Sequence, residues 1–318
     1  MIGRKTATVF GGAGFLGKYL VRKLAADGYA IRVACRRTDL ANDLRQLGDV
    51  GQVVPFYAPV QNEDAVAEVV SEASVVVNLA AILGAPSSAA LNAVNVEGAA
   101  RVARLAAAAG VQTFVHMSAI GASSTSPSAY GRSRAAGEEE VTRHFPPATI
   151  VRASVLFGPE DHFLNMLGGV ARYTPFVMPV YGASTKLQPV YVADVAEAIR
   201  VIISAFDENP STRSHLCELG GPEILTMRAI AERVLAMTGR NKPIFEVPSG
   251  LASLQAAVLE HLPGRMLTRD QLKMLTVDNV VDENLPGFRD LGIAPVAMDM
   301  IVPAYMKRYA PGGDKVNV

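Results

Sequence analysis

Three glycines near the start of the chain constrain its fold most: Gly11, Gly14 and Gly17 recur at three-residue spacing. They follow residues 8–10, a short apolar and β-branched run that is typical of a buried strand. The leucines after them recur at every fourth position and share one helical face: Leu16, Leu20 and Leu24. The stretch therefore predicts a strand, a glycine turn and a helix, in that order.

Each glycine in such a unit has a mechanical reason. One makes the tight turn, one lets the backbone approach a pyrophosphate, and one lets the helix pack closely on the strand. The start of the helix offers backbone N–H groups and the positive end of its dipole to phosphates. This context favours a dinucleotide site over a purely structural turn. The expected lining residues are Gly11, Gly14, Phe15, Leu16 and Gly17.

The second expected strand, residues 30–35, ends at Arg36 and Arg37. Dinucleotide sites commonly carry an acidic residue here, which holds the adenosine ribose hydroxyls. A carboxylate would repel a 2′-phosphate, whereas a guanidinium pairs with one through two hydrogen bonds. The two arginines therefore favour NADP(H) over NAD(H), the alternative being that both are solvated loop residues.

Strands and helices alternate through the next hundred residues. The expected strands are residues 53–57, 75–81, 113–118 and 149–154, and an alanine-rich helix is expected over about 89–109. This rhythm predicts an α/β fold, a Rossmann-type doubly wound parallel sheet. Ligands of such sheets lie beyond the carboxyl ends of the strands, so we expect Ala80 and Ala81 to line the adenosine side.

Composition excludes several classes of function. The 318 residues include 30 Lys plus Arg and 30 Asp plus Glu, so no basic excess attracts nucleic acid. The only cysteines, Cys35 and Cys217, are far apart, so we expect no disulfide framework, no metal site and a reducing compartment. Apolar runs stay shorter than the roughly 18 residues of a membrane span. The first strand starts close to Met1, which leads us to expect no leader peptide.

The regular rhythm ends near Phe157, where glycine and proline become frequent. We expect a Rossmann-type domain over residues 1–156, with a helix at 193–206 packing back on it, and a smaller mixed C-terminal lobe over 157–318. Residues 249–262 carry a helical apolar face that by default packs on its own domain and, if exposed, suits a partner helix or a bilayer surface. Its members are Leu251, Leu254, Val258, Leu259 and Leu262.

This order resembles the extended branch of the short-chain dehydrogenase/reductase superfamily, in which a Tyr-x-x-x-Lys pair and an upstream serine do acid–base work. The matching stretch is Tyr130-Gly-Arg-Ser-Arg134, and Ser118 matches the first serine position. The resemblance implies that Ser118, Tyr130 and Arg134 lie near the nicotinamide end of the cofactor. Arginine stays charged, and its larger planar fork does not simply replace an ammonium group.

The acid–base set is incomplete, because the superfamily's reactive hydroxyl position falls on Ala119 or Ile120. Tyr130 is therefore as well explained by a buried structural role as by catalysis, and no residue is assigned a firm catalytic role. Asn95 is interpreted as a structural hydrogen-bonding residue and His116 as a core histidine. The acidic run on the following helix is interpreted as a solvated face: Glu138, Glu139 and Glu140.

Several later stretches resemble one subgroup, the nucleotide-binding accessory subunit of respiratory complex I (NADH:ubiquinone oxidoreductase) in its α-proteobacterial form. They are residues 44–52, 157–165, 188–194, 267–271 and 285–293. The resemblance implies a tightly held NADPH with a structural role and no turnover. It also implies partners among the complex I subunits near the quinone site, at the junction of the hydrophilic arm and the membrane arm. The implied location is peripheral, on the cytoplasmic face of the bacterial inner membrane.

Two alternatives remain open from the sequence. One is a free NADP-dependent short-chain reductase, dehydrogenase or epimerase-like enzyme. The other is a redox sensor that docks on its partners only while NADPH is bound.

Overall fold

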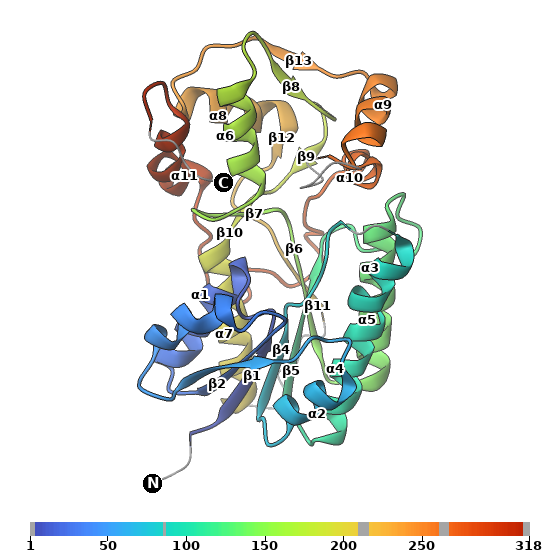
Figure 1. The fold of residues 1–318 in the computed structure, drawn as a ribbon, viewed down its shortest axis with the longest axis vertical. Helices are drawn as coiled ribbons and strands as arrows, with labels where there is room; N and C mark the ends of the chain where they lie inside the picture. Colours follow the sequence, from blue (N-terminus) through green and yellow to red (C-terminus); the bar gives the residue numbers. More distant parts are fainter. Residues whose placement is uncertain (1–3, 85–86, 209–215, 261–266, 314–318) are drawn as a thin grey trace. The chain divides into compact units, whose positions relative to one another are not determined.

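The computed structural model describes residues 4–84, 87–208, 216–260 and 267–313. The chain divides into two compact units (Figure 1), each of which is assembled from three separate stretches. The first unit comprises Met1–Ala153, Val192–Leu219 and Glu283–Ile293. The second comprises Ser154–Tyr191, Gly220–Asp282 and Ala294–Val318.

A parallel sheet forms the centre of the first unit. Among the described residues it has seven strands in the order β11-β6-β5-β4-β1-β2-β3, and every neighbouring pair is parallel. The strands are β1 (Thr6–Phe10), β2 (Ala30–Cys35), β3 (Val53–Tyr57), β4 (Val75–Asn78), β5 (Thr113–Ala119), β6 (Thr149–Ala153) and β11 (Leu216–Leu219). The predicted doubly wound parallel sheet is therefore confirmed.

Helices cover both faces of this sheet, as Figure 1 shows. On one face lie α1 (Phe15–Ala26) and α7 (Val192–Glu208). The other face carries α2 (Glu63–Val70), α3 (Ser88–Asn95), α4 (Glu97–Ala108) and α5 (Ala129–His144). Alternate strand residues such as Val76 and Phe114 point toward this second set of helices and form a core with Val102 and Val141. A 3₁₀ segment, η1 (Asp39–Leu47), lies between β2 and β3.

The single helix expected over 89–109 is wrong, because the chain breaks it at Val96. This residue has φ −110° and ψ −67°, which ends α3 and begins α4. The side chain of Asn95, just before the break, is turned to the backbone of Ile82 instead of to solvent. A tertiary contact thus interrupts a sequence whose alanine content favours one continuous helix.

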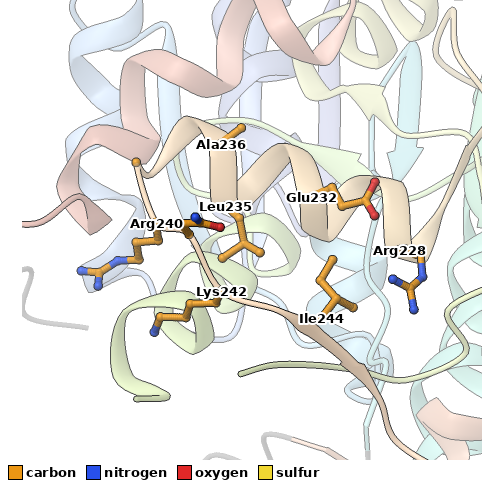
Figure 2. Close-up of a pocket in the computed structure, with 9 residues that line it drawn as sticks. Arg228, Glu232, Leu235, Ala236, Arg240, Lys242 and Ile244 are labelled. Atoms are coloured by element: carbon orange, nitrogen blue, oxygen red, sulfur yellow. The ribbon is translucent and has the colours of Figure 1, made fainter. Parts of the chain in front are cut away.

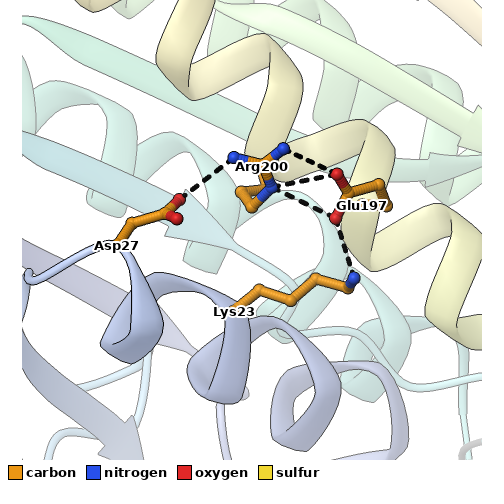
Figure 3. A network of polar contacts seen from close by, with 4 residues as sticks. All are labelled: Lys23, Asp27, Glu197 and Arg200. Atoms are coloured by element: carbon orange, nitrogen blue, oxygen red, sulfur yellow. Dashed lines mark hydrogen bonds and ion pairs between the residues drawn. The ribbon is translucent and has the colours of Figure 1, made fainter. Parts of the chain in front are cut away.

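Helices α1 and α7 are joined by a four-residue charge network (Figure 3). Lys23 Nζ lies 2.7 Å from a carboxylate oxygen of Glu197, and Arg200 Nη2 lies 2.6 Å from the other. Arg200 also reaches Asp27 at 3.3 Å. The Arg200 hydrogen bond, with the Lys23 contact, lowers the pKa of Glu197 to about 2. Two pairs of charged residues that are far apart in the sequence thereby tie the helix after the glycine turn to α7.

The second unit consists of short helices around a core of its own. Its helices are α6 (Phe163–Tyr173), α8 (Met227–Met237), α9 (Ser249–Leu259), α10 (Arg269–Met274) and α11 (Met298–Met306), followed by the 3₁₀ segment η2 (Lys307–Tyr309). Its two-stranded sheets pair β7 (Leu156–Phe157) with β10 (Val190–Tyr191), β8 (Met178–Val180) with β13 (Ile244–Glu246), and β9 (Lys186–Leu187) with β12 (Leu225–Thr226).

Asp161 joins α6 to α11 in this unit. Its carboxylate accepts hydrogen bonds from the backbone N–H of Leu164 at 2.6 Å and from the Tyr305 hydroxyl at 2.8 Å. Burial raises the pKa of Asp161 and these donors oppose the rise. The side chain therefore closes the first turn of α6 and anchors the C-terminal helix.

The apolar face expected over 249–262 does not pack on its own domain. In α9 the buried residues are Ala252 and Ala256, and the large side chains Leu251, Leu254 and Val258 are exposed. Leu259 is half-buried, and Leu262 lies outside the described residues. The default expectation for this face is therefore wrong. No helix among the described residues is long and apolar enough to cross a membrane.

Candidate nucleotide site

The backbone of the glycine turn packs so closely that its three positions favour glycine. Gly11 has φ +74°, a conformation that side chains disfavour, and its N–H donates to the carbonyl of Ala34 at 3.0 Å. A Cβ on Gly17 would overlap the backbone of the turn, at 2.5 Å from the Cα of Gly12. Gly14 is the N-cap of α1, and no described side chain caps this helix start. Phe15 and Leu16 form its first turn, so its N–H groups suit an anionic ligand.

The end of β4 lies directly beside this turn. A Cβ on Gly11 would stand 3.1 Å from the backbone N of Ala80, and that N–H donates to the side chain of Asn78 at 3.1 Å. Ala80 is half-buried and Ala81 is exposed. Small side chains therefore follow β4 where the backbone of the glycine turn is close, as a passing ligand would need.

Arg36 and Arg37 both lie exposed after β2, but their surroundings differ. Arg37 forms an ion pair with Asp39, with 2.7 Å between Nη2 and a carboxylate oxygen. This hydrogen bond lowers the pKa of Asp39 and raises that of Arg37. Arg36 forms no ion pair with any described residue. It is therefore the better placed of the two to receive an additional phosphate.

A buried cation lies beneath the carboxyl end of β5. Arg134 is 1% exposed, and its Nη2 donates to the carbonyl of Met117. Its Nε and Nη1, and the hydroxyl of buried Ser118, have no hydrogen-bond partner among the described residues. Buried polar groups are nearly always paired, and an unpaired charge is costly. These donors suit a ligand that presents oxygen acceptors. The hydroxyl oxygens of a nucleotide's ribose are such acceptors.

Tyr130 lies on α5, one turn before Arg134, and is half-buried. The superfamily's reactive hydroxyl has no counterpart nearby, because Ala119 and Ile120 occupy its positions. Ser123, further along, shares a hydrogen bond with Thr125 at 3.0 Å in an exposed turn. The site thus retains the tyrosine and the first serine without a complete acid–base set.

His116 is fully buried inside β5, as a core histidine should be. Its Nδ1 lies 3.3 Å from the side-chain nitrogen of Asn78, and its Nε2 has no partner among the described residues. Burial, and secondly the positive charge of Arg134, lower the pKa of His116 well below its usual range. The ring is therefore neutral, and the charge beside it belongs to Arg134 alone.

Asn95 holds structure together, as the sequence predicts. Its oxygen accepts from the N–H of Ile82 and its nitrogen donates to the carbonyl of the same residue, both at 3.0 Å. The nitrogen also donates to Ser133 at 3.0 Å. These bonds connect the segment after β4 to α3 and α5.

The interpretation of residues 138–140 as a solvated acidic face is wrong for Glu138, the first of them. Glu138 is 8% exposed, and its carboxylate lies 2.6 Å from Arg152 of β6. Arg152 also reaches Glu218 of β11 at 3.4 Å. Glu139 is exposed as expected, and Glu140 is half-buried. The packing of α5 on β6 brings Glu138 to Arg152, and the pairing of β6 with β11 brings Arg152 to Glu218, so no local pattern signals these contacts.

The described residues contain no group of His, Cys, Asp and Glu that could hold a metal ion. What the first unit assembles is a glycine turn, an uncapped helix start, exposed arginines after β2 and a buried cation beside a serine. This arrangement can bind phosphate and ribose oxygens. It offers less for proton transfer.

Comparison with known proteins agrees with this arrangement. Residues 7–216 match the model of the NAD dependent epimerase/dehydratase family. NADH dehydrogenase (ubiquinone) 1 alpha subcomplex subunit 9, mitochondrial, from Arabidopsis thaliana is 33% identical, over 96% of this chain and 78% of the relative. The mitochondrial NADH-ubiquinone oxidoreductase 40 kDa subunit of Neurospora crassa is 31% identical, over 97% of this chain and 80% of the relative.

The fold is also found in solved structures. UDP-glucose 4-epimerase from Thermotoga maritima has a TM-score of 0.70 at 17% identity, covering 96% of this chain and 98% of the epimerase. This similarity concerns the fold. The epimerase was solved with UDP-glucose.

Proposed function

Because the chain belongs to the NAD dependent epimerase/dehydratase family, and to the group in it that contains the subunit 9 relatives, we propose that it is a non-catalytic accessory subunit of respiratory complex I. The observation that carries the proposal is the similarity to two subunits of NADH:ubiquinone oxidoreductase along nearly the whole chain. This similarity covers both units of the chain, not only the unit with the glycine turn. The α-proteobacterial form stays a prediction.

The family implies a nicotinamide nucleotide, and the proposed one is NADPH. Support comes from the residues after β2, where two exposed arginines occupy the place of the usual acid. Gly11, Gly14 and Gly17, with the first turn of α1, would hold the pyrophosphate. Arg134 and Ser118 would meet ribose oxygens with atoms that no described residue satisfies. Bound NADPH can supply a hydride, but the proposed role does not use it.

A structural role for the nucleotide has a simple energetic basis. A ligand that binds only the folded state stabilises that state, by about 4 kcal/mol at a thousandfold excess over its dissociation constant. The incomplete acid–base set around Tyr130 supports binding without turnover. In this proposal the subunit stabilises the junction of the hydrophilic and membrane arms, on the cytoplasmic face of the inner membrane.

The alternative, a free NADP-dependent reductase or epimerase-like enzyme, is tested on the purified protein. We expect NADPH to remain bound through gel filtration and to stay reduced when a panel of carbonyl substrates is added. The Tyr130→Phe variant should retain the nucleotide and its attachment to native membranes. NADPH oxidation that depends on a carbonyl substrate and is lost in Tyr130→Phe would instead establish an active reductase.

A further inference from the structure

An open groove of about 490 Å³ runs beside α8 in the second unit (Figure 2). Between its two ends lie the apolar Leu235 and Ile244, with Glu232 between Leu235 and Arg228. Arg228 stands at one end, and Arg240 and Lys242 stand at the other. Glu232 is the one carboxylate among the described residues that line it. The groove therefore has a net positive charge.

Two of the three cations, Lys242 and Arg240, are held by backbone carbonyls. Lys242 Nζ donates to the carbonyl of Ala171 at 2.6 Å and to that of Thr174, at the C-terminal end of α6. Arg240 Nε donates to the carbonyl of Tyr309 at 2.9 Å. None of the three cations forms an ion pair with a carboxylate of the described chain. Burial and the charge of Arg240 lower the pKa of Lys242, so these two cations repel each other.

Large aromatic side chains are exposed on the segment whose backbone holds Lys242. Thr174, whose carbonyl receives Lys242, lies between Tyr173 and Phe176, which are 74% and 81% exposed. Phe245, 48% exposed, follows Ile244 in β13, so its side chain points to the opposite side of the strand from the groove. The three cations of the groove and the two exposed aromatic residues that flank Thr174 are here called the basic-aromatic surface. It comprises Arg228, Arg240, Lys242, Tyr173 and Phe176.

We propose that the basic-aromatic surface binds the acidic phospholipid headgroups of a bilayer. Aromatic side chains favour the boundary between headgroups and acyl chains, and cations beside them attract anionic lipids. Phe176 and Tyr173 would enter the headgroup layer, while the groove receives phosphates between Arg228 and Lys242. This adds a direct lipid contact to the proposed function, which by itself requires only protein partners.

Charge argues for this surface over the other exposed apolar face. Helix α9 exposes Leu251, Leu254 and Val258 but contains no charged residue between Ser249 and Leu259. Nothing in that helix selects an acidic partner, so it provides a matched control. Leu254, 66% exposed, compares with Phe176 in exposure and apolar character.

The test is sedimentation of the purified full chain with vesicles. One set contains phosphatidylcholine alone, and the other mixes it with phosphatidylglycerol. We expect binding to the acidic vesicles that weakens with added salt, and little binding to the neutral ones. Arg228→Gln should weaken the binding about fivefold, the effect of one cation near an anionic surface. Phe176→Ser should weaken it by at least as much, and Leu254→Ser should leave it unchanged.

Three results would overturn the proposal: no binding to acidic vesicles, equal binding to both sets, or a loss in Leu254→Ser as large as in Phe176→Ser. All substituted side chains are exposed, and the melting temperature of each variant checks that it folds. A chain that binds acidic vesicles but purifies without respiratory subunits would refute the proposed function and leave this inference standing.

Discussion

The two arginines after β2 differ in what they already bind, and this difference is testable. Arg37 forms an ion pair with Asp39, whereas no described carboxylate pairs with Arg36. We expect Arg36→Ala to weaken NADPH binding about tenfold to a hundredfold, the worth of a hydrogen bond to a charged group. Arg37→Ala should cost less, and NADH binding should change in neither variant. Isothermal titration calorimetry measures both ligands.

The control for this pair is Arg22→Ala, an exposed arginine on α1 in the same unit. It should alter neither affinity. If Arg36→Ala weakened NADH and NADPH binding equally, the preference for the 2′-phosphate would be refuted.

The role of Arg134 can also be tested by substitution. Its guanidinium is buried with two nitrogens that no described residue satisfies, so the protein without nucleotide bears the cost of an unpaired charge. We expect Arg134→Met to leave the melting temperature of the nucleotide-free protein unchanged or higher, and to reduce the further rise that NADPH produces. Arg134→Lys keeps the charge and should retain most of that rise. A large fall in the nucleotide-free melting temperature of Arg134→Met would mean that the charge is needed by the fold itself.

At the scale of elements, the contact between α1 and the glycine turn leaves no space for a methyl group at Gly17. Gly17→Ala should destabilise the protein by about 1–3 kcal/mol, the usual cost of overpacking, and should displace the helix start that would hold the pyrophosphate. Chemical denaturation measures the first effect and nucleotide titration the second.

The matched control is Gly169→Ala in α6, where an added Cβ would meet nothing within 4 Å. Alanine favours a helix over glycine by about 1 kcal/mol, so this variant should be as stable as the original or more so. Equal destabilisation in both variants would show that close packing at Gly17 is not the cause.

The α1–α7 network predicts a pH dependence. The pKa of Glu197 is about 2 in the folded protein, compared with 4.5 for a glutamate without these contacts. The contribution of the ionised Glu197 to stability is therefore fully present above pH 4.5. That contribution is lost as the pH falls from about 4.5 to 2. We expect Glu197→Gln to lower stability at neutral pH by about 1 kcal/mol at most, because such partly exposed pairs are screened.

The stability difference between the original protein and Glu197→Gln should shrink across that acidic range in urea denaturation. Exposed Glu139 provides the control substitution, Glu139→Gln, which should show no such trend. A difference that stayed constant with pH would mean that the charge of Glu197 contributes nothing.

The sequence predicted correctly those strands that are specified by their own apolar residues and flanking turns. Strands 30–35 and 53–57 have the expected bounds, since apolar runs flanked by turn residues specify them. Strand β11 was missed, because its four residues, Leu216–Leu219, become a strand only by pairing with β6 across more than sixty residues. The buried contact of Glu138 with Arg152 was missed because it depends on how α5 packs against β6.

The same distinction holds for the candidate site. Spacing located the glycine turn and the arginines after β2, and the resemblance located Ser118, Tyr130 and Arg134. Nothing in the sequence indicated that Arg37 forms an ion pair with Asp39, since that depends on side-chain orientation in the turn. The unsatisfied nitrogens of Arg134 likewise follow from its burial beneath β5 and not from its neighbours in the sequence.

At the scale of the whole molecule, both units are assembled from separated stretches of chain. The first unit takes its edge strand β11 and residues Glu283–Ile293 from the second half of the sequence. The N–H of Glu218, in that edge strand, donates to the carbonyl of Pro286 at 2.9 Å. Relatives that match more than 95% of the chain therefore match both units and the connections between them.

The proposed function requires that this chain works as an accessory subunit that keeps its nucleotide. The most direct test is to solubilise native membranes gently, purify through a tag on this chain, and identify the proteins and nucleotide in the eluate. We expect NADH:ubiquinone oxidoreductase subunits together with near-stoichiometric NADPH. A lone protein, free of those subunits, would contradict it.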